Sequence, residues 1–274
     1  MFRTNNPALK EEAFKPAQTW DSFMGHGTGR QSEMVAAEPK VMTLQGTINA
    51  TFILLCLTGV GAVGGFAFLR SNPGLLYITA FGSSIIAFVA GYFLIAIKPK
   101  LAPYLAPVFS VLLGVFATAA SIMWAGYASS GKNAGSNVGQ MIIFQAGVLT
   151  VGIAAAMLIA YTTRLIKPSQ RLLGGIIAAT GGVFFFGLAC VVINFFYPSV
   201  IQSMWESPLG LAIAGFIVIV AAANLILDFA IIESGVENRS PKHMEWFAAF
   251  GLVLTLVWLY VSLLRLLALL AQRD

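Results

Sequence analysis

The stretch NLILDFAIIESG, from Asn224 to Gly235, decides the fold class because it places a carboxyl group, Asp228, inside a long apolar run. Apolar residues continue on its amino-terminal side as far as residue 208. The run is therefore as long as the roughly 20 residues that cross the core of a bilayer as a helix. An acid at such a position needs an explanation, and the rest of the chain gives the context.

The whole chain has the composition of a membrane protein. It is 58% hydrophobic and 10% charged, whereas a soluble domain has about 25% charged residues. Because irregular backbone cannot face lipid, every apolar span should be a helix. We predict an all-α, polytopic bundle of seven transmembrane helices in a lipid bilayer, within a domain of residues 46–274. The expected spans are 47–69, 74–97, 101–126, 139–163, 172–197, 208–232 and 246–270.

Residues 1–45 form a polar tail that carries both signs of charge and lacks the apolar run of a signal peptide. Of the Lys and Arg residues, twelve fall in the tail and on its side of the membrane, and four on the other side. Cytoplasmic loops carry the excess of these residues. The sequence predicts a flexible cytoplasmic tail and an external carboxyl terminus. Loop charge also explains the net charge of +5, so no nucleic-acid partner is expected.

Glycine is concentrated in two spans, as GVGAVGG from Gly59 to Gly65 and as GGIIAATGG from Gly174 to Gly182. Small residues allow transmembrane helices to approach closely. No strand is expected before either cluster, so neither has the context of a phosphate-binding loop. We expect both clusters to pack against neighbouring helices.

Asp228 is the acid that lies within an apolar span, about one helical turn or 5 to 6 Å from its cytoplasmic edge. Acids inside a membrane face the bundle interior and usually mark a pathway or a partner. One interpretation is a proton-sensitive functional group. The other is a neutral carboxyl, or one hydrogen-bonded to Asn224 on the same face of the helix.

Other polar residues are expected at the same end of the bundle. Gln45 and Asn49 lie at the start of the first span, and Glu245 lies at the start of the last. All three are candidate neighbours of Asp228. Glu245 has an alternative interpretation, as an acid that stabilises the amino terminus of its own helix.

Several chemistries lack the residues that they need. No lysine lies within the last span, as retinal attachment would require, and the two histidines, His26 and His243, lie outside the spans. Metal-ligand spacing is also absent. We expect neither an enzyme nor a bound cofactor.

Three segments carry a resemblance to a known family: MTLQGTINAT from Met42, NLILDFAIIESG, and SPKHMEWFAAFGLVLTLVWLYVSLLRLL from Ser240. Together they resemble the Bax inhibitor-1 (transmembrane Bax inhibitor motif) family, in particular its bacterial branch. The resemblance implies a seven-helix fold and a pH-sensitive calcium leak. It also implies a latch of two aspartates near the cytoplasmic end. Asp228 matches the first aspartate, and Thr255 occupies the place of the second.

Two functions are therefore expected as alternatives. The first is a multi-pass protein of a bacterial inner membrane that leaks calcium as its transported ion, with Asp228 as the pH-responsive gate. The second is a non-conducting regulator that binds another membrane protein, such as a membrane-bound protease.

Overall fold

The protein is described by a computed structural model that covers residues 41–91, 97–131, 137–166 and 168–273. Within these residues it consists of helices and loops and has no strand, so the all-α, polytopic class is confirmed. Six helices are long and apolar enough to cross a membrane. They are α1 (Leu44–Ser71), α4 (Ala102–Ser129), α5 (Val138–Thr162), α6 (Gln170–Phe196), α8 (Pro208–Glu237) and α9 (Met244–Ala271).

The second expected span is shorter in the described part of the chain. After the 3₁₀ turn η4 (Pro73–Leu75) it comprises α2 (Leu76–Ser84) and a π-helical segment, η5 (Ile85–Ala90). Residues 92–96, at its expected end, lie outside the described residues, and the chain resumes before the 3₁₀ turn η6 (Pro99–Leu101). The count of seven spans thus stays a prediction.

One expected loop is a helix. The segment SVIQSMWES was expected to be a connection, but Pro198–Glu206 forms α7. Proline at the first position suits a helix start, because its missing N–H would be unpaired there anyway. Ile201, Met204 and Trp205 share one partly buried face of this short helix, whereas Gln202 and Ser203 are exposed.

Three of the long helices have a hydroxyl side chain at the N-cap position. Thr43 accepts a hydrogen bond from the Gly46 N–H at the start of α1, and Ser169 and Ser207 cap α6 and α8 in the same way. Such caps satisfy N–H groups that have no partner inside the helix, which fixes where each helix begins.

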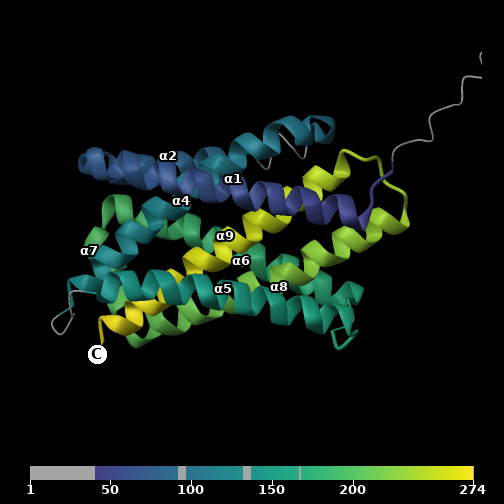
Figure 1. The fold of residues 1–274 in the computed structure, drawn as a ribbon. Helices are drawn as coiled ribbons and strands as arrows, with labels where there is room; N and C mark the ends of the chain where they lie inside the picture. Colours follow the sequence, from purple (N-terminus) through teal and green to yellow (C-terminus); the bar gives the residue numbers. More distant parts are fainter. Residues whose placement is uncertain (1–40, 92–96, 132–136, 167, 274) are drawn as a thin grey trace, which may run out of the picture. The chain divides into compact units, whose positions relative to one another are not determined.

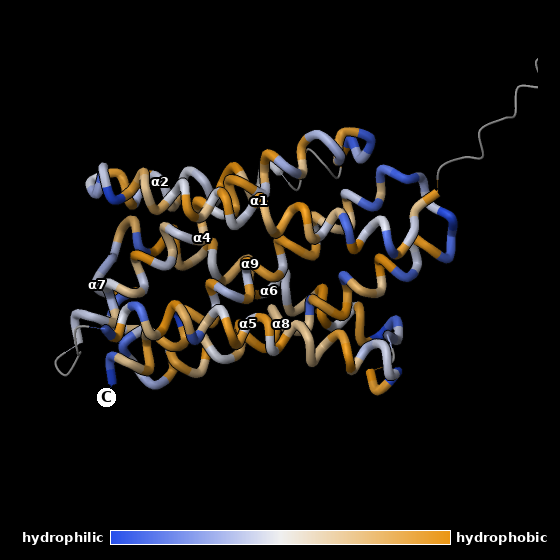
Figure 2. The backbone as a smooth tube through the Cα atoms, viewed as in Figure 1, coloured by the Kyte–Doolittle hydropathy of each residue, from blue (hydrophilic) through white to orange (hydrophobic). Residues whose placement is uncertain are grey.

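Helix α9 is the centre of the bundle and the most buried of the six long helices. It contacts α1 and α4 on one side and α5 and α8 on the other, as the yellow ribbon in Figure 1 shows. Figure 2 shows hydrophobic residues along the helices and polar residues near their ends. We call the end where α1 and α9 begin and α8 finishes the Glu245 end, and the opposite end the Arg265 end.

The two glycine clusters behave differently. A Cβ atom at Gly61 would lie 2.1 Å from the Val111 carbonyl oxygen, and one at Gly114 would lie 2.0 Å from that of Thr58. Helices α1 and α4 therefore touch through their backbones, as expected for Gly61 of the first cluster, whereas a Cβ atom at Gly59 or Gly64 would meet nothing within 4 Å. In contrast, a Cβ atom at Gly174, Gly175, Gly181 or Gly182 of α6 would meet nothing within 4 Å. Within the described structure, the expected packing role of the second cluster is wrong.

Candidate functional site

Asp228 lies on the face of α8 that packs against α9. A Cβ atom at Gly251 would be 3.7 Å from Asp228 Oδ1, an ordinary van der Waals contact, so the carboxyl group lies directly beside Gly251 of α9. The hydroxyl group of Thr255, one turn further along α9, lies beside the Asp228 carboxyl group. The Asp228 Oδ2 atom is buried and has no hydrogen-bond partner among the described residues. The acid thus points into the bundle.

Thr255 links this carboxyl group to the backbone of α9. Its Oγ1 donates to the Gly251 carbonyl oxygen at 3.1 Å. A hydroxyl group has one proton, so while Thr255 donates to Gly251 it can only accept from Asp228. A protonated Asp228 suits this arrangement because it can donate. An ionised Asp228 would need the Thr255 proton for itself and would leave the Gly251 carbonyl oxygen without it.

Asn224 does not take part in this contact. Its side-chain amide donates to Thr180 Oγ1 of α6 at 2.7 Å and to the Val220 carbonyl oxygen at 2.8 Å. The interpretation in which Asp228 is hydrogen-bonded to Asn224 is therefore wrong. Asn224 joins α8 to α6 instead.

Glu245 forms a second site on α9, and it is 3% exposed. Its Oε1 accepts from the Thr43 backbone N–H and from Thr43 Oγ1, each at 3.0 Å. A Cβ atom at Gly46 would lie 2.2 Å from the same oxygen, so α1 needs glycine there. The carboxylate thus lies at the amino terminus of α1, where the helix dipole favours negative charge. The acid stabilises the start of α1 rather than only that of its own helix.

The residues just before α1 reinforce this contact. Val41 forms a bridge with Pro241, and the Met42 N–H donates to the Ser240 carbonyl oxygen at 2.7 Å. The Met42 side chain is buried in a cluster with Ile232 and Ala248. The predicted tail therefore ends in residues that pack on the α8–α9 loop, while residues 1–40 lie outside the described residues.

Gln45 and Asn49 are exposed on α1 and bond to each other, with the Gln45 amide donating to Asn49 Oδ1 at 3.1 Å. In the described part of the chain, neither forms a hydrogen bond with Asp228 or Glu245. The polar residues of the Glu245 end are thus divided into separate pairs. Along α9, Glu245 precedes Gly251 and Thr255 by about 9 and 15 Å.

A third polar cluster was missed from the sequence. Glu233, near the end of α8, accepts from Arg164 Nη2 at 2.7 Å and from the Tyr161 hydroxyl group. Arg164 lies just after α5 with a φ of 57°. From the sequence alone, Glu233 is an acid at the end of an apolar span, where water can solvate it. No local pattern indicated a partner about seventy residues away on another helix.

Among the described residues, no three His, Cys, Asp or Glu side chains gather as metal ligands. The Arg164–Glu233 pair is the ion pair found in that part of the chain. Asp228 therefore has a hydroxyl partner and no cationic partner there. Such a site can change its hydrogen bonding when the acid gains or loses a proton.

This arrangement defines a polytopic helical membrane protein with a buried acid between two of its helices. The family model described as "Bax inhibitor 1 like" matches residues 6–272, so the chain belongs to the Bax inhibitor-1 family. Comparisons with curated proteins and with solved structures gave no match.

Proposed function

We propose that the protein is a pH-responsive cation leak pathway of a bacterial inner membrane, with calcium as the transported ion, and not an enzyme. In this proposal the tail is cytoplasmic and Asp228 is the gate near the cytoplasmic side. One observation carries it: a buried carboxyl group between α8 and α9 lies beside the Thr255 hydroxyl group, and one of its oxygen atoms has no hydrogen-bond partner among the described residues. Membership of the Bax inhibitor-1 family supports it.

The direction of the response follows from the contacts of Asp228. A neutral carboxyl group fits between α8 and α9, because it donates to Thr255 and carries no charge into the membrane. A charged Asp at the centre of a membrane helix costs about 2.5 to 3.5 kcal/mol, and less near the interface. Separation of α8 from α9 would let water reach the carboxylate. Raising the pH through the titration of Asp228 should therefore shift the bundle from closed to open.

The test is calcium flux in proteoliposomes across a range of pH, with Asp228→Asn as the central variant. Asparagine has nearly the same shape but no titratable proton, so its leak should be low and independent of pH. The matched control is Glu237→Gln, which removes an exposed acid from the same helix and should keep the wild-type response. Identical flux from the wild type and Asp228→Asn at every pH would exclude Asp228 as the gate.

A second function is favoured by the surface of α6. This helix is the least buried of the six, and all five of its glycines face open space. Small residues are enriched where transmembrane helices bind one another. We therefore also propose that α6 binds a helix of another membrane protein, such as a membrane-bound protease, and that the chain regulates it without conducting ions.

Leucine substitutions on α6 test this second function. Gly175→Leu with Gly182→Leu should abolish co-purification of the membrane partner and leave the thermal stability of the isolated protein unchanged. Gly61→Leu is the contrasting variant, since it would force α1 from α4 and should unfold the bundle. Full retention of the partner by the α6 variant, or calcium flux without any partner, would contradict this function.

A further inference from the structure

Two adjoining pockets lie at the Arg265 end of the bundle, far from Asp228 and Glu245. The larger has a volume of about 560 Å³ and the smaller about 300 Å³. Both are lined by Leu76 and Ile122, so they share a wall. Ligand pockets in proteins have volumes of roughly 300 to 1,000 Å³, so the space is large enough for a bound molecule.

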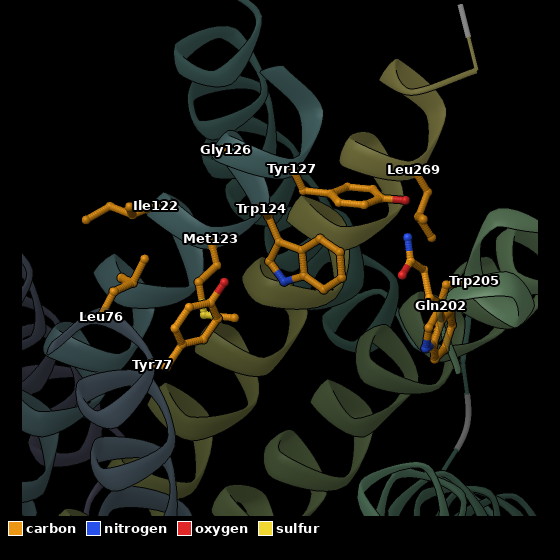
Figure 3. A pocket seen from close by; sticks show the side chains of 10 residues that line it. All are labelled: Leu76, Tyr77, Ile122, Met123, Trp124, Gly126, Tyr127, Gln202, Trp205 and Leu269. Carbon is orange, nitrogen blue, oxygen red and sulfur yellow. The ribbon is translucent and has the colours of Figure 1, made fainter. Parts of the chain in front are cut away.

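The walls of the larger pocket are apolar and aromatic. Figure 3 shows Tyr77 of α2 on one side, Trp205 and Gln202 of α7 on the other, and Trp124 and Tyr127 of α4 between them. Tryptophan and tyrosine are typical of the interfaces of a bilayer, where one part of the ring system is wet and the rest apolar. Such walls suit hydrocarbon chains near a headgroup.

Positive charge lies beside these walls. The guanidinium carbon of Arg265 is 3.3 Å from the ring centroid of Trp205 and 5.4 Å from that of Trp124. Both tryptophans also line the larger pocket, and Arg265 lies against their rings without lining the pocket itself. The Arg265 Nε atom is buried and has no hydrogen-bond partner among the described residues. Arg70 lines the smaller pocket.

Neither arginine has an ion-pair partner in the described part of the chain. Glu206, the acid that the described residues place at this end, accepts from the Gln202 amide at 2.9 Å. Stacking on an indole ring stabilises a cation by about 0.5 to 2 kcal/mol but leaves its charge uncompensated. The site therefore has positive charge that an external anion could neutralise.

The depth of the two arginines indicates what kind of anion this is. Arg70 is the residue before the last of α1, and Arg265 lies six residues before the end of α9, or about 9 Å along the helix. Helices of 28 residues are about 42 Å long, which exceeds the roughly 30 Å hydrocarbon core. Both cations thus lie close to the headgroup region, where phosphates of lipids are found.

We infer that this end of the bundle holds one anionic phospholipid, with its phosphate at Arg265 and its acyl chains in the two pockets. Arg70 adds positive potential beside the smaller pocket. The site is independent of the proposed leak, because none of its residues belongs to the contacts of Asp228 or Glu245. Binding should favour a lipid of net negative charge over a zwitterionic one with the same chains.

Quenching of tryptophan fluorescence by lipids with brominated acyl chains tests the site, because Trp124 and Trp205 line the larger pocket. The full chain in detergent is titrated with brominated phosphatidylglycerol and, separately, with brominated phosphatidylcholine of the same chain length. The anionic lipid should quench at a lower concentration. Trp124→Phe and Trp205→Phe should each remove part of the quenched signal, which assigns it to the pocket.

The arginine variants separate charge from packing. Arg265→Gln and Arg70→Gln should each weaken the binding of the anionic lipid roughly fivefold. Arg265→Lys keeps the charge and should weaken it less than Arg265→Gln. Arg239→Gln is the control, since it removes an exposed arginine from the Glu245 end and should change nothing. Should Arg265→Gln unfold, Arg70→Gln and Arg265→Lys still decide the result.

Three outcomes would overturn the inference. Equal quenching by the two lipids would show that charge plays no part. An equal loss with Arg239→Gln would show a general effect of surface charge. Displacement of the lipid by inorganic phosphate alone would show a site for a small anion and not for a lipid.

Discussion

At the scale of single residues, Thr255 determines how the Asp228 proton is held. The resemblance implies an aspartate at this position, and two acids in contact would share their protons and titrate as a pair. A threonine hydroxyl group does not titrate, so this chain has one acid and one proton at the α8–α9 contact. Its pH response should follow a single protonation step.

Replacing Thr255 tests this arrangement. Thr255→Val keeps the shape but removes the hydroxyl group, so a neutral Asp228 loses its acceptor and the closed contact weakens. Hydrogen bonds between membrane helices contribute about 0.6 kcal/mol on average. The calcium leak at low pH should thus rise about threefold in proteoliposomes. Thr255→Ser restores the hydroxyl group and should behave as the wild type; equal leaks from the Val and Ser variants would argue against it.

Some residues of the candidate site could be predicted from the sequence, and others could not. The position of Asp228 inside an apolar span was sufficient to single it out, because a buried acid is costly wherever it lies. Its partner could be found only through the register of the family motif, which led to Thr255. The role of Glu245 was only partly visible, since its partner Thr43 lies 202 residues away and shares no periodic pattern with it.

At the scale of elements, the contact between the start of α1 and the start of α9 depends on a charged acceptor. Glu245→Gln keeps the side-chain shape but loses the charge that favours the α1 terminus. Interactions of this kind contribute about 0.3 to 1 kcal/mol, and up to about 2 when partly buried. We expect the variant to be about 1 to 2 kcal/mol less stable in thermal or denaturant unfolding in detergent.

Two comparisons decide whether this loss belongs to the α1–α9 contact. Glu237→Gln removes an exposed acid and should change stability by less than about 0.5 kcal/mol. In a double-mutant cycle, Thr43→Ala and Glu245→Gln should be less than additive, because Thr43→Ala removes the hydroxyl hydrogen bond that Glu245→Gln weakens. Additive losses would place the effect of Glu245 elsewhere.

The long helices could be predicted from the sequence, whereas the short helix α7 and the contacts of α6 could not. Long apolar spans identified the six long helices, because twenty apolar residues have few alternatives in a bilayer. The short helix α7 was missed because its nine residues are too few to cross a bilayer, although its four polar side chains share one face of the helix. The glycines of α6 were assigned to packing from composition alone, although composition does not say which helix faces which.

At the scale of the whole molecule, the bundle is organised around α9. This one helix contributes Glu245 to the contact with α1, Gly251 and Thr255 to the contact with Asp228, and Leu269 to the larger pocket at the other end. The order of the spans along the chain could be predicted from the sequence. The central position of the last span could not be predicted, because all six long helices are similarly apolar.

The central position of α9 has a mechanical consequence. An α-helix is stiff along its axis, so a tilt imposed at one membrane surface displaces its far end in the opposite leaflet. Asp228 packs against one half of this helix, and the two pockets lie near its other end, so both proposed sites are positioned by the same rigid element.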